Sequence, residues 1–181
     1  MKPALRVAVV VATVWAAVPL LMRADAPTQS GAAETQLRLA ALLSAEGRYA
    51  EALDAYARVL GVEDPAVLAA ARKGVVRTAL RTGRFSMAAE QSALLMRTRP
   101  QDPEVLGLHG DALWAVGLFA DAAAAYRECV ALDSRRARGH RGIARSLAGL
   151  NRLDEAIGEA LVAVALAPED PETHQRSHAV R

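Results

Sequence analysis

Two sets of basic residues recur along the chain at the spacing of a helix. The first set is placed every four residues and consists of Lys73, Arg77 and Arg81. The second set is spaced by three and then four residues and consists of Arg138, Arg141 and Arg145. Each set shares one face of its helix. Because a guanidinium binds a carboxylate through two parallel hydrogen bonds, the two faces suit an acidic peptide or a chain-terminal carboxylate.

Acidic residues and a tryptophan lie between the two basic sets. Glu104 and Asp111 could instead pair with the flanking cations, in which case the ion pairs are structural and contribute about 0–1 kcal/mol each. Trp114 is either an aromatic anchor for a partner or a packing residue between neighbouring helices. The sequence alone leaves both alternatives open.

Other reactive side chains form no recognisable constellation. His109 and His140 are expected to be partly buried, and Cys129 is expected to be buried and inert. His174 and His178 have the i,i+4 spacing of metal ligands, but no third ligand accompanies them. We find no glycine-rich phosphate loop and no nucleophile next to a base. The sequence therefore predicts no catalytic residue, no metal and no cofactor.

The distribution of charge argues against a general nucleic-acid binder. The net charge of +2 comes from residues 1–31, which hold Lys2, Arg6 and Arg23 against Asp25. The remaining residues carry 19 of the 22 basic and 19 of the 20 acidic side chains. A neutral body lacks the excess positive charge that binding to phosphate backbones needs.

The first residues read as a targeting segment. Residues 1–6 carry two positive charges, and the apolar run over residues 7–22 is interrupted only by Thr13 and Pro19. This layout predicts a signal peptide or signal anchor over residues 1–26, followed by a linker at 27–32. The segment Ala24-Asp25-Ala26 has the small-x-small form of a cleavage site, but Pro27 follows it, so cleavage stays open. Either way, the rest of the chain is expected on the periplasmic side of a bacterial inner membrane, anchored or exported.

The body of the chain repeats at a period of about 34 residues. Four turn residues are spaced by 36, 34 and 34 positions, and they are Gly47, Gly83, Gly117 and Asn151. Five residues after each turn stands an alanine: Ala52, Ala88, Ala122 and Ala156. Seven residues before each turn stands a small or β-branched residue: Ala40, Val76, Gly110 and Ala144. Small residues at both positions let two helices approach closely, so each period predicts a helical hairpin.

This pattern resembles the tetratricopeptide repeat family, most clearly over residues 103–134. There Leu106, Gly110, Leu113, Ala122 and Tyr126 match the family's signature spacing. The resemblance implies an all-α fold, a right-handed superhelical array of about four antiparallel hairpins. Its approximate repeats are residues 33–66, 69–102, 103–136 and 137–170, within a repeat region of 33–168. First helices are expected near 34–46, 66–82, 103–116 and 136–149, and second helices near 49–61, 85–98, 119–132 and 153–167. Residues 169–181 form a polar tail.

The resemblance also places a binding groove on the first helices of the hairpins. In the present numbering the implied groove residues are Lys73, Arg77, Arg81, Asp111, Trp114, Arg138, Arg141 and Arg145. The resemblance further implies a non-catalytic scaffold that holds a protein or peptide partner, acidic in chemistry, during assembly of an envelope or secretion system. Asparagines that clamp a carboxylate in some family members are absent here.

The last expected helix is more apolar than an exposed array end should be, because residues 160–167 read ALVAVALA. A terminal repeat normally presents a polar outer face. We therefore expect this face to be covered by a partner, by a second copy of the chain or by the tail. The alternative functions are an assembly or stability factor that binds through the fourth hairpin and an accessory subunit of an envelope enzyme.

Overall fold

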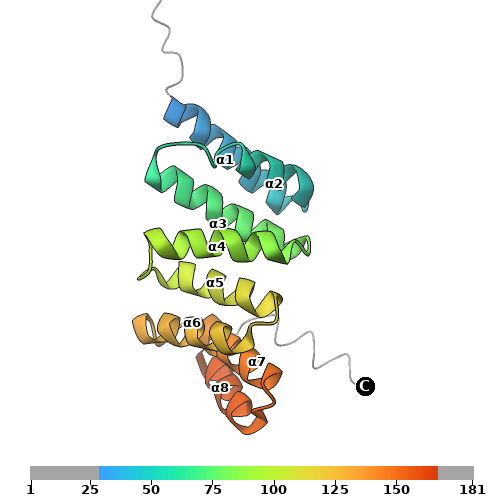
Figure 1. Cartoon of the computed structure of the whole chain (residues 1–181), viewed down its shortest axis with the longest axis vertical. Helices are drawn as coiled ribbons and strands as arrows, with labels where there is room; N and C mark the ends of the chain where they lie inside the picture. Colours follow the sequence, from blue (N-terminus) through green and yellow to red (C-terminus); the bar gives the residue numbers. More distant parts are fainter. Residues whose placement is uncertain (1–28, 167–181) are drawn as a thin grey trace, which may run out of the picture.

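The computed structural model describes residues 29–166, and these form eight α-helices and no strand. The expected targeting segment at 1–26 and the polar tail at 169–181 lie outside the described residues. The helices are α1 (Gln29–Ala45), α2 (Tyr49–Ala57), α3 (Pro65–Arg81), α4 (Phe85–Thr98), α5 (Pro103–Ala115), α6 (Phe119–Leu132), α7 (Ala137–Gly149) and α8 (Leu153–Leu166). They pair as four antiparallel hairpins that stack along the long axis (Figure 1).

The four turn residues close the first helix of every hairpin in the same way. Each adopts a left-handed backbone, with φ of 76° at Gly47, 72° at Gly83, 83° at Gly117 and 59° at Asn151. In each turn the next residue donates its N–H to a carbonyl five residues earlier, as Arg84 does to Ala79 at 2.8 Å. Glycine and asparagine tolerate this conformation best, and the predicted turns are therefore confirmed.

Small residues lie where the two helices of a hairpin meet. Ala40 and Ala52 share one buried cluster, and Val76 and Ala88 share another. All four side chains are completely buried. The predicted all-α array of four hairpins is thus confirmed, and its core is a row of clusters, one following another along the array.

Two boundaries differ from the sequence-based prediction. Helix α1 begins at Gln29, inside the expected linker at 27–32, because Ala33 packs in a cluster with Val59, Val67 and Ala71. Helix α2 ends at Ala57 and not near residue 61. After it, Leu60 donates its N–H to Ala57 and Val62 donates to Val59, which tightens the chain into turns. This stretch accounts for the longer first period of 36 residues.

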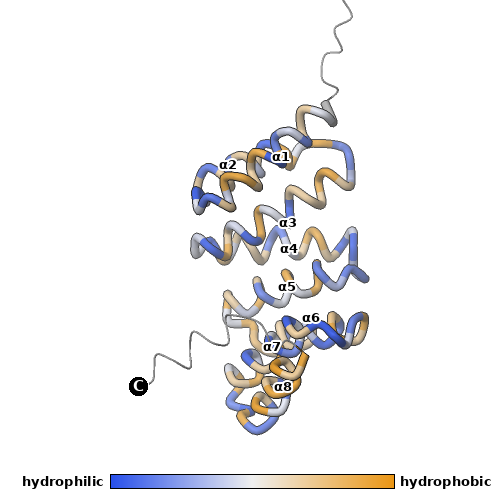
Figure 2. Tube along the Cα trace, turned by 180° about the vertical axis from the view of Figure 1, so that it is seen from behind, coloured by the Kyte–Doolittle hydropathy of each residue, from blue (hydrophilic) through white to orange (hydrophobic). Residues whose placement is uncertain are grey.

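No helix within residues 29–166 is both long and apolar enough to cross a lipid bilayer. The second helices of the first three hairpins carry mixed polar and apolar residues, whereas α8 is apolar along most of its length (Figure 2).

Candidate binding groove

Three first helices line a groove on one face of the array. Helices α3, α5 and α7 pack side by side, each against the next. The groove between them has a volume of about 730 Å³. Five arginines, one aspartate and two aromatic residues are among its lining side chains, namely Arg77, Arg81, Arg138, Arg141, Arg145, Asp111, Phe85 and Trp114. The lining therefore carries four more positive than negative charges, which favours an anionic occupant.

The structure thus gathers seven of the eight predicted groove residues around one cavity. The eighth, Lys73, does not line it. The Lys73 ammonium instead donates to Asp102 at 2.9 Å and to Glu104 at 2.6 Å, and its side chain is only 17% exposed. Lys73 links α3 to the beginning of α5.

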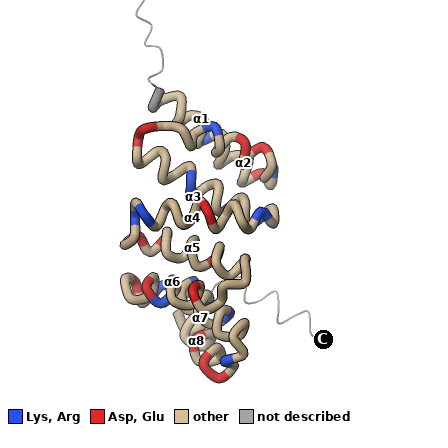
Figure 3. The backbone as a smooth tube through the Cα atoms, viewed as in Figure 1, with Lys and Arg blue, Asp and Glu red and all other residues tan. Residues whose placement is uncertain are grey.

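Several of the cations predicted to bind a ligand form ion pairs with acidic residues on the neighbouring helix. Arg77 of α3 donates to Glu104 of α5. Arg138 and Arg145 of α7 both donate to Asp111 of α5, one to each carboxylate oxygen. The pairing of Glu104 and Asp111 with the flanking cations is therefore observed, and it leaves other guanidinium N–H groups of these arginines for a ligand. Figure 3 shows the charged residues distributed over all four hairpins.

A buried tyrosine completes the cluster around Asp111. The Tyr126 hydroxyl of α6 donates to Asp111 at 2.5 Å and accepts from Arg145. Burial raises the pKa of this hydroxyl, and the neighbouring carboxylate of Asp111 raises it further. Tyr126 therefore stays protonated and holds Asp111 in place beneath the groove. The sequence analysis named Tyr126 only as a residue of the repeat signature and missed this role.

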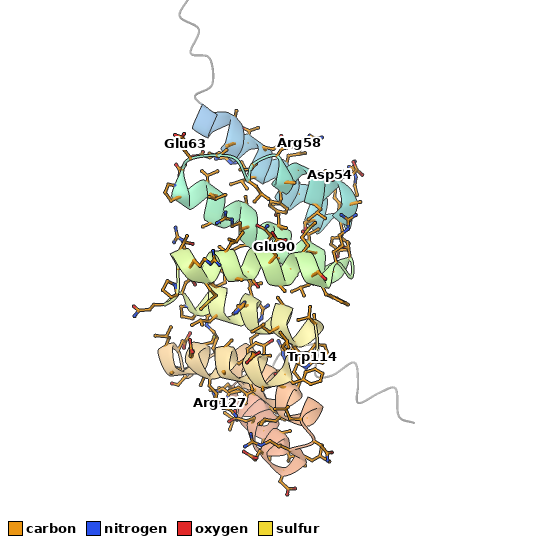
Figure 4. The ribbon with its side chains drawn as sticks, viewed as in Figure 1. Asp54, Arg58, Glu63, Glu90, Trp114 and Arg127 are labelled. Atoms are coloured by element: carbon orange, nitrogen blue, oxygen red, sulfur yellow. The ribbon has the colours of Figure 1, made fainter. Side chains whose placement is uncertain are left out.

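Trp114 lies at the rim of the groove, at the end of α5 (Figure 4). The Arg145 guanidinium carbon lies 4.7 Å from the centre of the Trp114 ring, a cation–π distance. Trp114 also contacts Phe119, with ring centres 6.0 Å apart. Since the indole is 37% exposed, it both packs between repeats and presents a surface to the groove.

The ion pairs at the start of α5 shift the pKa values of their members. Burial by itself would raise the pKa of Glu104, but the hydrogen bond from Lys73 and the charge of Arg77 outweigh it and hold that pKa below its ordinary value. The pKa of Asp102 is lowered by the same balance between burial and Lys73. Asp102 also caps α5, since its Oδ1 accepts from the N–H of Glu104 at 2.9 Å.

The remaining reactive side chains have structural partners. His109 Nδ1 lies 3.0 Å from the Ser92 hydroxyl, and burial lowers the pKa of His109. His140 lies 2.7 Å from Glu159 of α8. Cys129 is buried and directs its thiol to the carbonyl of Pro103, and burial raises its pKa. No group of three or more metal-binding side chains occurs within the part of the chain that the structure describes.

Comparison with known proteins identifies the repeat. Residues 108–171 match the model of the tetratricopeptide repeat family. The sequence has no significant match among curated proteins. The resemblance that the turn register predicted is therefore confirmed by sequence over the third and fourth hairpins, which the match spans.

Solved structures extend the likeness to the whole array. A thermophilic TPR protein, TTC0263 of Thermus thermophilus, is 23% identical and superposes with a TM-score of 0.65 over 74% of each chain. MamA of strain AMB-1 is 19% identical, with a TM-score of 0.66 over 84% of this chain and 87% of its own. MamA of Desulfovibrio magneticus RS-1 is 16% identical, with a TM-score of 0.68 over 76% and 77%. At these identities the likeness establishes the fold.

Proposed function

We propose that this tetratricopeptide repeat protein is a non-catalytic scaffold that binds an acidic peptide, or the C-terminal carboxylate of a partner protein, in the groove of α3, α5 and α7. The observation that carries the proposal is the composition of the groove, in which five arginines and Trp114 surround a single carboxylate. An acidic ligand would neutralise this excess of positive charge, which contributes favourably to the free energy of binding.

The internal ion pairs leave donors for such a ligand. A guanidinium has five N–H donors, and Arg138 uses its Nη2 toward Asp111. Arg138 can therefore keep its pair with Asp111 while donating from the other edge to a bound carboxylate. Asp111 and Tyr126 then act as positioning residues, because they fix the guanidinium of Arg145 against the Trp114 ring before a ligand arrives.

The place of action follows from the first residues of the sequence. Their basic and then apolar pattern supports an anchored or exported protein, so the groove would face the periplasm and serve the assembly of an envelope or secretion system. The fourth hairpin supports a second candidate, an assembly factor that binds through α8. The observation that favours this second candidate is an exposed apolar surface on α8, formed by Leu153, Ile157, Leu161, Val162 and Val164.

Peptide binding to the full-length chain in mild detergent tests the first proposal. A fluorescent peptide that ends in consecutive aspartates and glutamates should bind. A variant with a C-terminal amide in place of the carboxylate measures the contribution of the chain terminus, and Glu→Lys variants measure that of the acidic side chains. Arg81→Glu together with Arg141→Glu should weaken binding about tenfold or more, since charged hydrogen bonds contribute about 1.5–3 kcal/mol each.

Arg127→Glu is the matched control. It makes the same change of charge on α6, outside the groove (Figure 4), and should leave the affinity close to that of the parent. Equal weakening by the control and the groove variant would reject the groove as the binding site. An effect of Leu161→Asp, with none from the groove variant, would favour the fourth hairpin.

A further inference from the structure

The outer face of α1 is exposed, although the later first helices bury the same face. Five residues before the four turns stand Leu42, Thr78, Ala112 and Ser146, and eight residues before them stand Leu39, Val75, His109 and Ile143. In α3, α5 and α7 these side chains are buried against the preceding hairpin, except that His109 is half-buried. No hairpin precedes α1 within residues 29–166, and there Leu39 is 44% and Leu42 62% exposed. Helix α1 thus presents the kind of face that joins helices elsewhere in the array.

Two opposite charges stand at equal distances from Leu42. Arg38 is four residues before it and Glu46 four residues after it, and both are exposed. The N–H of Glu46 donates to the carbonyl of Leu42 at 3.0 Å, so the helical turn continues to Glu46 and the three side chains form one row. Arg38 belongs to the same outer face, because the residues nine positions before the later turns are all buried, namely Gly74, Leu108 and Gly142.

A two-fold axis at Leu42 matches this row with itself. Two antiparallel copies of α1 related by such an axis bring together residues that are equally far before and after Leu42. Arg38 of each copy then meets Glu46 of the other, and Leu39 of each lies against the small Ala45 of the other. A parallel arrangement would instead place each charge against its like, which is unfavourable. The row is therefore complementary to itself in the antiparallel orientation.

Glu46 can accept a second cation without losing the one it has. Its Oε2 accepts from Arg48 of the same chain at 3.2 Å. A carboxylate has two acceptor oxygens, and Asp111 holds two arginines in this way, Arg138 on one oxygen and Arg145 on the other. Glu46 can therefore present its Oε1 to Arg38 of a second copy.

The outer face of α1 lies at one end of the array, away from the groove. Helix α1 begins the stack of hairpins, and none of its residues lines the groove (Figure 1). Two copies that meet through α1 would stack end to end. Both grooves would then stay open to their partners.

We infer that α1 is a self-association surface, through which two copies of this chain form an antiparallel, two-fold dimer centred on Leu42, with Arg38 of each copy bound to Glu46 of the other. The contact is one helix wide, so we expect a weak, concentration-dependent dimer near the lower limit of specific interfaces, about 1,200 Å² of total buried surface. The inference goes beyond the proposed function and does not depend on a peptide ligand.

Disulfide trapping at the two-fold axis tests the placement, with the full-length chain in mild detergent. A residue on the axis faces its own equivalent, so Leu42→Cys should form a disulfide between two chains. Leu118→Cys is the matched control, because Leu118 is another exposed leucine, in the turn between α5 and α6. It should cross-link about tenfold more slowly, since contact sets the effective concentration of the second thiol. Cys129 is buried and stays outside the reaction.

Charge exchange followed by sedimentation equilibrium tests the orientation. Arg38→Glu or Glu46→Arg alone should raise the dissociation constant of the dimer about tenfold or more, because each change places like charges together twice. The two changes combined should return it to within about threefold of the parent. The two residues are about 12 Å apart along α1, so only pairing between chains can produce this rescue. Arg97→Glu on α4, an equal change of charge at another exposed arginine, should leave the dissociation constant unchanged.

Several outcomes would overturn the inference. A parent chain that sediments as a monomer at every concentration would leave residues 1–28 or another protein as the occupant of the α1 face. Equal cross-linking of the two cysteine variants would show that chance encounters join the chains. A combined charge variant no better than the single ones would reject the antiparallel pairing. A dimer that cross-links through Leu42→Cys and is rescued by the double exchange supports it.

Discussion

Single glycines set the distance between neighbouring helices in this array. Gly142 of α7 lies under the Tyr126 ring, and the same tyrosine reaches Asp111 and Arg145 with its hydroxyl. The ring can bring its hydroxyl to the carboxylate only because no side chain separates it from α7. Gly110 of α5 lies against the same ring, since an added Cβ there would be 2.7 Å from it, so two residues without a Cβ position the charged cluster beneath the groove.

Replacing this glycine should be costly despite the higher helix propensity of alanine. In Gly142→Ala the new Cβ would lie 2.5 Å from the Tyr126 ring, so the ring or α7 must move, and we expect the free energy of unfolding to fall by about 1–3 kcal/mol. Gly158→Ala on α8, where nothing lies within 4 Å, should instead raise it by about 0.5–1 kcal/mol. Urea unfolding of both variants measures the difference, and equal effects would contradict the packing argument.

Ion pairs between first helices bind the elements together at the groove. Lys73 and Arg77 of α3 hold Glu104 of α5, and Arg138 and Arg145 of α7 hold Asp111 of the same helix. Helix α5 thus supplies carboxylates to both neighbours. This arrangement aligns three helices with like-charged side chains, which would otherwise repel one another across the groove.

These pairs should make stability depend on acidity. The pKa values of Asp102 and Glu104 are lower in the folded chain than their ordinary values of 3.8 and 4.5. The unfolded chain therefore binds protons first, so the stability they contribute is present above pH 4.5 and is lost as the pH falls through their folded values. Glu104→Gln should flatten this acid limb of the unfolding free energy, measured by urea unfolding from about pH 3 to about pH 7.

Glu63→Gln serves as the matched control for that pH series, because Glu63 is exposed in the connection between α2 and α3 (Figure 4). It should retain the slope of the parent. A Glu104→Gln variant whose pH dependence is indistinguishable from that of the control would show that these ion pairs do not contribute to acid sensitivity.

The sequence predicted the helices of the array more completely than the contacts of the groove residues. The turn glycines and the repeated alanines act within one hairpin, so their local geometry predicted all four hairpins. Whether Arg138 and Arg145 form ion pairs with Asp111 depends on the distance between α5 and α7. The spacing of residues along one helix does not determine that distance. For the same reason the sequence left Trp114 undecided between packing and binding. The start of α1 at Gln29 was missed because Ala33 gains its contacts from α3 and the end of α2.

At the scale of the whole molecule, the array is joined only through neighbouring helices. The helix pairs with substantial contact within residues 29–166 are of three kinds: the two helices of one hairpin, a second helix with the next first helix, such as α4 with α5, and successive first helices, such as α5 with α7. Stability is then a sum of local terms and nearest-neighbour interfaces. A loss at one interface cannot be offset by contacts between distant hairpins.

A defect at the centre should therefore divide the array. Leu95 of α4 is completely buried in the cluster with Val105 and Leu108 of α5, so Leu95→Ala should cost about 2–5 kcal/mol at this interface. Hydrogen exchange should show lost protection in α4 and α5 first, while the hairpin of α7 and α8 keeps most of its own. Leu161→Ala, which removes an exposed leucine from α8, should leave the protection pattern unchanged. Uniform loss of protection along the chain in Leu95→Ala would instead mean that the four hairpins unfold as one unit. Contacts between neighbours produce such cooperative unfolding only when each interface contributes more free energy than the hairpins have on their own.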